Sequence, residues 1–509
     1  MLARTIRPRL ALVSFLVLAA AAPSAVAQPA GASKPSEPVA APLPLDTPLA
    51  TLDGAPITRR DLLRRLVQRY RSTKEGETAL SELIDNRLVE REVNARGIAV
   101  DAAAVEAKFA SLDKMMADAG AGKTLAEELR ERGVAEAEFR ERLRLLIGLE
   151  SLARSDFGLK EGEEVPTAKQ HLWLKTAREK AKIEYPAGTD GPNVAIVDGE
   201  AVTVERFGEE LEKALPPERL RESLNEAVGI RLVAKLSADA QVAVTDDDVR
   251  ADIAARKKQF EADPRFQGVP YDEYVKATRG AGAESFLSDP DFRAQVALKK
   301  IVVAREGREA VRKRFDERQD LYGARVHAKH VFVQASEKPL PPPLGDGKTT
   351  RSFADAEKLV RDAKKELDGG AKWKDVVSKY SEDASRLREG DLGFFPERNR
   401  FGAEFFAAAK ALAPEAVSEP IRSEYGWHLV QLVETRPAPP FEEAFERVLA
   451  DLAGDRYREA FNAAKVEFLP AAPIATKSAK EKPGPGESPG SDGGAPADGK
   501  ENGAPPRGR

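Results

Sequence analysis

The chain contains no cysteine, only four histidines and few aromatic residues (6%). The absence of cysteine excludes disulfides, thiol chemistry and the acylated cysteine of a lipoprotein. Beyond the N-terminus, no apolar run approaches the roughly 18 residues that a membrane-spanning helix needs. The 80 basic residues are balanced by 84 acidic ones, so the net charge is −4 and no basic face for nucleic acid is expected. With 32% charged residues, the composition is typical of a helical, well-solvated protein.

The N-terminus has the pattern of a secretory signal peptide. Three arginines lie between residues 4 and 9, Leu10–Ala22 is apolar, and Ala25-Val26-Ala27 is a small-x-small cleavage site. About 13 apolar residues are too few to cross a bilayer core. A buried core helix would not explain the charged start or the Pro-rich segment that follows. We therefore expect a signal peptide at residues 1–27, a mature chain that begins at Gln28, and an exported protein of a bacterial periplasm.

Two flanking segments are poor in apolar residues. Residues 28–46 are rich in Pro, Ala and Ser, and residues 471–509 consist mainly of Gly, Pro, Ser, Lys and Glu. Such segments cannot bury enough surface to offset their conformational entropy. We expect a disordered linker and a disordered tail. The tail could also tether the protein to the cell wall.

An internal repeat lies between these flanks. The motif Leu52–Thr58 returns about 145 residues later as Val197–Thr203. Each copy predicts a short strand, an Asp-Gly turn, and a second strand whose final Thr is a helix N-cap. A longer helix follows in each copy, where Arg87-Leu88-Val89 is matched by Arg231-Leu232-Val233. The sequence therefore predicts two related helical lobes.

The ends of the two copies also match. Ala181–Tyr185 corresponds to Ala464–Phe468, but the second string comes only after an unrelated module. The second copy is therefore predicted to be split. We expect a first lobe at 47–187 that closes with its own helix and strand, a second lobe at 193–324 with 437–470, and an inserted module at 325–436.

The inserted module carries the residues that point to chemistry. It opens with a strand, Val326–Val333, and closes with another, Tyr425–Glu434. Two of the four histidines, His330 and His428, lie in these strands. Between them come Lys379-Tyr380-Ser381-Glu382-Asp383-Ala384-Ser385 and Gly390-Asp391-Leu392-Gly393-Phe394-Phe395-Pro396.

This order of parts resembles the parvulin family of peptidyl-prolyl cis/trans isomerases. The resemblance implies a four-stranded antiparallel sheet with surrounding helices. Together with the two mostly helical lobes of the repeat, this predicts an α+β protein. It implies catalytic roles for His330, Asp383 and His428. It implies a substrate-binding set of Leu392, Phe401, Phe405, Tyr425 and Ser385. Phe401 stands where the family usually has Met.

Prolyl isomerisation breaks no bond, and its barrier of about 18–20 kcal/mol comes from lost amide resonance. An apolar socket and a few polar groups suffice, so we expect no cofactor and no metal. A zinc site from His327, His330 and His428 would need residues three apart on a strand, which point to opposite faces. Structural roles stay open: the histidines as a core pair, Asp383 as a helix cap, and the apolar residues as ordinary core.

The bodies of the two copies resemble the chaperone domain of survival-factor-type periplasmic chaperones and of secretion foldases. We therefore expect a periplasmic chaperone with an embedded isomerase, acting on unfolded or nascent exported polypeptides with Xaa-Pro bonds. Neither nucleic acid nor stable membrane insertion is expected. Lys338, Lys348 and Arg351 are too scattered to predict phosphoserine-proline recognition. The alternatives are a holdase with an inactive module and an envelope-anchored scaffold.

Overall fold

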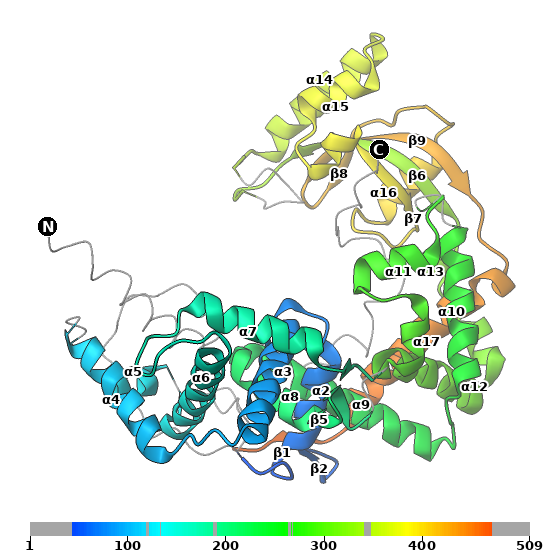
Figure 1. Cartoon of the computed structure of the whole chain (residues 1–509). Helices are drawn as coiled ribbons and strands as arrows, with labels where there is room; N and C mark the ends of the chain where they lie inside the picture. Colours follow the sequence, from blue (N-terminus) through cyan, green and yellow to red (C-terminus); the bar gives the residue numbers. More distant parts are fainter. Residues whose placement is uncertain are drawn as a thin grey trace, which may run out of the picture. The chain divides into compact units, whose positions relative to one another are not determined.

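The computed structural model describes residues 43–118, 122–132, 134–186, 191–262, 266, 268–339 and 348–470. The predicted signal peptide, the tail 471–509 and most of the linker 28–46 lie outside these residues. The described chain divides into two compact units (Figure 1). Of the described residues, the first unit holds those up to Ala297 and those from Tyr457 to Pro470, and the second holds those in Leu298–Arg456.

The first unit contains two runs of elements in the same order, each opened by a β-hairpin. The first run is β1 (Pro48–Leu52), β2 (Ala55–Thr58), α2 (Arg59–Tyr70), α3 (Lys74–Ala95), α4 (Ala102–Asp118), α5 (Leu125–Glu131), α6 (Glu136–Asp156), α7 (Thr167–Lys180) and β3 (Ile183–Glu184). The second run is β4 (Asn193–Val197), β5 (Glu200–Thr203), α8 (Val204–Ala214), α9 (Pro217–Asp239), α10 (Asp246–Glu261), α11 (Tyr271–Arg279), η2 (Ala283–Ser288) and the start of α12 (Pro290–Glu317). The unit also contains the end of α17 (Phe441–Ala463) and β10 (Val466–Phe468).

The two hairpins have the same backbone geometry. Asp53 and Asp198 have φ angles of 50° and 49°, and each precedes a glycine that also has positive φ. Two successive residues with positive φ make the tight turn whose twist suits a hairpin. At the end of the second hairpin, Thr203 Oγ1 accepts the Arg206 N–H at 3.1 Å and so caps the next helix. The predicted tandem repeat is confirmed.

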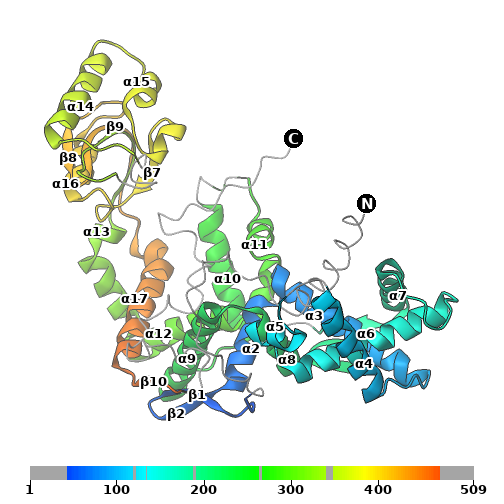
Figure 2. The same cartoon turned by 90° about the vertical axis from the view of Figure 1, so that its left-hand side faces the viewer.

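The closing strands, however, pair across the two copies, and Figure 2 shows β10 beside β1. We expected the strand that ends at Tyr185 to close the first copy. Instead β3 pairs antiparallel with β4, and β10 pairs antiparallel with β1, so the sheets have the orders β3-β4-β5 and β10-β1-β2. β3 precedes β4 by only a few residues, and an antiparallel neighbour needs no more than a short connection. The lobe boundaries at 47–187 and at 193–324 with 437–470 remain a proposal.

The second unit contains the module with its four-stranded antiparallel sheet, in the order β7-β6-β9-β8. Its elements are β6 (Arg325–Gln334), α14 (Phe353–Asp368), α15 (Trp373–Tyr380), η3 (Ala384–Arg388), β7 (Asp391–Phe395), α16 (Ala403–Ala411), β8 (Ile421–Ser423) and β9 (Gly426–Arg436). Helices α14 and α15 pack on one face of the sheet against Val331, Val333 and Leu429. Helix α16 packs on the other face against Val326 and Val430. The predicted α+β fold class is confirmed.

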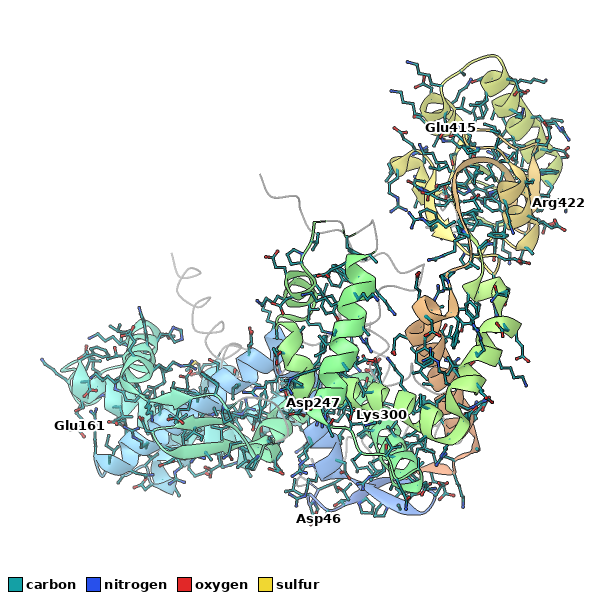
Figure 3. The ribbon with its side chains drawn as sticks, turned by 90° about the vertical axis from the view of Figure 1, so that its right-hand side faces the viewer. Asp46, Glu161, Asp247, Lys300, Glu415 and Arg422 are labelled. Atoms are coloured by element: carbon teal, nitrogen blue, oxygen red, sulfur yellow. The ribbon has the colours of Figure 1, made fainter. Side chains whose placement is uncertain are left out.

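One edge of this sheet is formed by β8. Figure 3 labels Arg422 on β8 and Glu415 in the loop that precedes it. The Glu415 N–H donates to the Leu432 carbonyl at 2.8 Å, and the Arg422 guanidinium lies 4.5 Å from the centre of the Phe353 ring. The loop before β8 thus continues the pairing along β9 on the side where β8 lies.

Outside the module, the second unit contains the rest of α12, α13 (Gln319–Tyr322) and most of α17. The Tyr322 hydroxyl donates to Asp451 Oδ2 at 2.9 Å, and Lys299 Nζ donates to Glu446 Oε2 at 2.6 Å. After the module, α17 therefore returns along α12. Within the described ranges, none of the helices combines the length and apolarity needed to cross a membrane.

Excising residues 326–436 and joining the cut with a short Gly/Ser linker should leave the remaining protein folded. Arg325 and Arg436 are direct strand partners, so the cut ends lie within about 5–6 Å of each other. α17 and β10 then stay in the chain and keep their packing. Circular dichroism and size-exclusion chromatography should show a helical, soluble protein.

The control ends the chain at Ala324, which removes α17 and β10 together with the module. This variant should aggregate, because it exposes the apolar face of α12 and the free edge of β1. Equal behaviour of the two deletions would show that the segment after the module does not complete the fold.

Candidate active site

The two central strands of the module place two imidazoles side by side. His330 on β6 and His428 on β9 point to the face that α16 covers, since side chains alternate along a strand and Ala328 and Val430 pack there. Their Nδ1 atoms lie 3.2 Å apart, and their ring planes differ by 20°. His330 is 1% exposed and His428 is 2% exposed. Water is therefore excluded from both rings.

Polar groups extend this pair at both ends. His330 Nε2 lies 3.0 Å from Asp383 Oδ2 and 2.9 Å from Ser385 Oγ, and the Ser385 hydroxyl donates to Asp383 Oδ1 at 2.8 Å. At the other end, His428 Nε2 lies 2.8 Å from Ser423 Oγ. The result is a continuous buried chain of hydrogen bonds from Asp383 to Ser423.

Only one proton fits between the two Nδ1 atoms, and this determines the direction of every bond in the chain. When His330 is neutral, its Nε2–H donates to Asp383, its Nδ1 accepts from His428 Nδ1–H, and His428 Nε2 accepts from the Ser423 hydroxyl.

Burial and neighbouring charges lower the pKa values of both Asp383 and His428. Burial opposes ionisation of Asp383, but the hydrogen bond and charge of His330, with hydrogen bonds from Ser385, bring the pKa of Asp383 down to about 2. Burial lowers the pKa of His428 well below its ordinary value, and the charge of His330 lowers it further. Asp383 is therefore an anion and His428 a neutral imidazole at neutral pH.

The loop that carries Asp383 is fixed to β6 by backbone contacts on both sides. The Phe332 N–H donates to Ser381 Oγ at 3.1 Å, and the Glu382 N–H donates to the Phe332 carbonyl at 2.9 Å. At the far end of the loop, the His330 N–H donates to the Gly390 carbonyl at 2.8 Å. A Cβ atom on Gly390 would lie 2.1 Å from the His330 carbonyl oxygen, and its φ of 77° also requires glycine.

An aromatic cluster covers the imidazoles on the side of α16. Phe401 and Phe405 stack with centroids 4.6 Å apart, and both rings meet His428 edge-on at 5.7 and 5.3 Å. Phe332 stacks on His428 at 4.8 Å. Leu392 packs against the same cluster and is partly exposed, as is Phe401, whereas Phe405 is 1% exposed. Leu392 and Phe401 thus form the partly exposed side of this apolar cluster, and Phe405 lies in its buried part.

The structure brings together seven of the eight residues that the sequence singled out. These are His330, His428, Asp383, Ser385, Leu392, Phe401 and Phe405. The eighth, Tyr425, lies in the turn between β8 and β9, and its N–H donates to Ser423 Oγ at 3.3 Å. Among the described residues, its ring makes no contact with the imidazoles, so its substrate-binding role rests on sequence position alone.

Two residues of the site were missed by the sequence reasoning. Ser423 bonds to His428, and Phe332 stacks on it. The signal for Phe332 was its place two residues after His330, which puts both side chains on one face of the strand. The only signal for Ser423 was that it carries a hydroxyl and lies shortly before the strand that contains His428.

His327 lies on the opposite face of the sheet. Its Nε2 is 2.7 Å from Asp391 Oδ1, and its ring lies 5.0 Å from the ring of Phe394. The zinc site considered from His327, His330 and His428 therefore does not assemble. Across the described parts of the chain, there is no group of three or more His, Cys, Asp or Glu side chains suited to a metal ion.

The family model of the rotamase, PPIC-type PPIase domain matches residues 330–434. These residues belong to the parvulin family. The protein named chaperone SurA of Nitrosospira multiformis is 36% identical over 111 residues, which are 22% of this chain and 22% of that protein. Chaperone SurA of Xylella fastidiosa is 36% identical over 134 residues, 26% of each chain. This chain thus spans about a quarter of the length of the curated relatives that it matches.

Among solved structures, the peptidylprolyl isomerase PrsA of Bacillus anthracis is 21% identical to this chain. The match covers 46% of this chain and 88% of PrsA, with a TM-score of 0.23.

Replacing His428 with Gln should change how the stability of the parvulin domain depends on pH. The pKa of His428 is lowered on folding, so the unfolded chain binds the proton first as the pH falls. The wild-type domain should therefore keep its full stability above about pH 6.5 and lose up to about 1.4 kcal/mol per pH unit below it. His428→Gln should remove this slope and cost about 1–3 kcal/mol at pH 7. Urea unfolding of fragment 325–436 between pH 7 and 5 measures both effects.

Two further variants serve as controls. His327→Gln removes a half-buried imidazole from the same sheet and should keep the wild-type slope. Asp383→Asn should lower the stability by a constant amount between pH 7 and 5 and keep the wild-type slope there, because the lowered pKa of Asp383 gives stability that is fully present above about pH 4 and is lost only as the pH falls toward 2. A wild-type domain with flat stability between pH 7 and 5 would contradict the buried, neutral His428.

Proposed function

We propose that this protein is a periplasmic folding factor, a chaperone with an embedded peptidyl-prolyl cis/trans isomerase. The observation that supports this proposal best is the parvulin site itself. An ionised Asp383 and a buried imidazole pair adjoin an apolar socket of Leu392, Phe401 and Phe405. These are the groups that a catalyst of amide rotation needs.

In the proposed mechanism, the socket holds the proline ring and keeps water from the prolyl amide. Planar amide resonance places negative charge on the carbonyl oxygen, and twisting the C–N bond removes it. The carboxylate of Asp383 next to that oxygen therefore disfavours the planar form relative to the twisted one. His330 and His428 hold Asp383 in place, and Ser385 and Tyr425 contact the substrate backbone. Neither a nucleophile nor a cofactor takes part.

The proposed substrates are unfolded or nascent exported polypeptides with Xaa-Pro bonds, without a requirement for phosphate. Arg351, a basic residue in the loop after β6, already binds the Glu382 carboxylate through two nitrogens, each 2.8 Å from an oxygen. Such a bidentate pair leaves the guanidinium committed to the domain. The proposed chaperone role draws on the similarity to proteins named chaperone SurA, and the proposed periplasmic location draws on the signal-peptide pattern.

One observation favours the alternative, a holdase whose parvulin domain binds peptides without catalysis. Phe401 takes the position at which the family usually has Met, and its ring stacks directly on Phe405. In this alternative, the rigid ring narrows the socket and keeps proline out. Peptide binding without isomerisation would then be the observed behaviour.

The isomerase activity of fragment 325–436 on a prolyl peptide, in a protease-coupled assay, tests the proposal. The wild-type fragment should accelerate isomerisation. Phe405→Ala and Asp383→Ala should each lower kcat/KM by roughly tenfold or more, since each removes an interaction worth about 1.4 kcal/mol or more in the transition state. Leu392→Ala should have a smaller effect in the same direction.

Phe406→Ala is the matched control. Phe406 is the next residue of α16 and is 4% exposed, so its truncation costs similar packing energy, but its ring meets Phe395 and not the imidazoles. Its kcat/KM should stay within about threefold of wild type when the fragment is folded by circular dichroism. A wild-type fragment without activity that still binds the peptide would support the holdase instead.

A further inference from the structure

Equivalent helices of the two copies cross at equivalent residues. α2 and α8 each follow the hairpin of their copy, and they pack closely on each other (Figure 1). Counted from the capping residues Thr58 and Thr203, Leu63 in α2 corresponds to Gly208 in α8. A Cβ atom on Gly208 would lie 2.7 Å from Leu63 Cβ and 2.9 Å from the Leu63 carbonyl oxygen. Two equivalent positions that touch lie on a two-fold axis.

The hairpins obey the same two-fold relation. Lys465 N–H donates to Asp53 Oδ1 at 2.8 Å, and Lys182 N–H donates to Asp198 Oδ1, also at 2.8 Å. The strand registers agree as well, because Val466 faces Leu52 and Ile183 faces the equivalent residue Val197. Each hairpin is thus closed by the strand of the other copy.

The helices that follow also exchange partners. α2 packs mainly against α8 and α9, whereas α8 packs against α2 and α3. Arg91 of α3 forms an ion pair with Asp198, and Lys235 of α9 forms one with Asp53. The hairpin and first helix of each copy, residues 48–70 and 193–214, are therefore held by the body of the other copy. We call these two segments the arms.

The contact between the arms is symmetric in backbone but not in charge. Arg59 is 4% exposed and binds Glu212 at 2.6 Å and Glu209 at 3.3 Å. Arg60 and Arg64 both lie 3.4 Å from Glu205. The face of α2 is thus basic and the face of α8 is acidic. Pairing α2 with α2, or α8 with α8, would bring like charges together around the buried position of Arg59.

We propose that the first unit is an internal two-fold dimer with exchanged arms, and that its charge asymmetry makes the second copy in the same chain the specific partner of the first. The same polypeptide supplies α8 to α2 at high effective concentration, so a second chain is not needed. This interaction surface is consequently closed within one molecule. The inference is independent of the isomerase activity.

Exchanging the two axial residues tests the symmetry. In the full chain, Gly208→Leu alone should lower the melting temperature by roughly 5–10 °C, because the new side chain meets both the side chain and the backbone of Leu63. Adding Leu63→Gly should recover at least half of that loss. In the double variant the leucine side chain stands on α8 and the glycine on α2, so the two equivalent positions have only exchanged their residues. The matched control is Gly148→Leu in α6, where Cβ would meet Val93 at 2.8 Å. Leu63→Gly should give that variant no recovery, and equal recovery for both would refute the axis.

Reversing one ion pair tests whether the dimer is internal. Arg59→Glu and Glu212→Arg should each lower the melting temperature by roughly 5–10 °C, because each leaves a buried charge beside a like charge. Both changes in one chain should recover at least half of the loss. The two single variants, unfolded together and refolded as a mixture, should remain destabilised and elute with the mass of one chain. Recovery in the mixture with the mass of two chains would show exchange between chains and overturn the proposal.

Discussion

The parvulin domain depends on one contact, the 3.2 Å approach of His330 Nδ1 to His428 Nδ1 between its two central strands. Because only one proton fits there, the contact orders the hydrogen bonds on both sides and leaves one imidazole neutral. The neutral ring can be buried under Phe401 and Phe405, whereas a charged one would carry a large desolvation cost. The other ring faces the carboxylate of Asp383, whose Oδ2 lies 3.0 Å from His330 Nε2. Socket and carboxylate are thus held together by a single pair of side chains.

Much of this site follows from the sequence, because alternation along β6 and β9 puts the two histidines on one face of adjacent strands. The tight loop at Gly390 could also be predicted, since the glycine stands next to Asp391-Leu392-Gly393. Tyr425 was named from the family resemblance, and Ser423 was not considered, because the sequence does not reveal where β8 ends and the turn begins. A difference of two positions separates Tyr425 from Ser423, the side chain that meets His428, and element boundaries are the least certain part of a sequence-based prediction.

The strand exchange shows a different limit of the sequence. The repeat itself was evident, but Ile183 can pair with Val197 or with Leu52 in the same register, because the two hairpins are equivalent. Sequence similarity between the copies therefore cannot distinguish an exchanged from an unexchanged arrangement. The choice lies in tertiary details that carry little pattern, such as the glycine at position 208 and the glutamates that meet Arg59. The exchange also means that β1 can pair only after β10 is available, more than four hundred residues later in the sequence. This large sequence separation predicts slow folding of the first unit.

The central claim, that His428 is held neutral between His330 and Ser423, is tested most directly by the imidazole nitrogen resonances of ¹⁵N-labelled fragment 325–436 during a pH titration. The account predicts that the two His428 nitrogens keep the separate shifts of a neutral ring from pH 7 down to pH 5. Their convergence to imidazolium shifts with a midpoint near 6.5, the ordinary value for an exposed histidine, would contradict it.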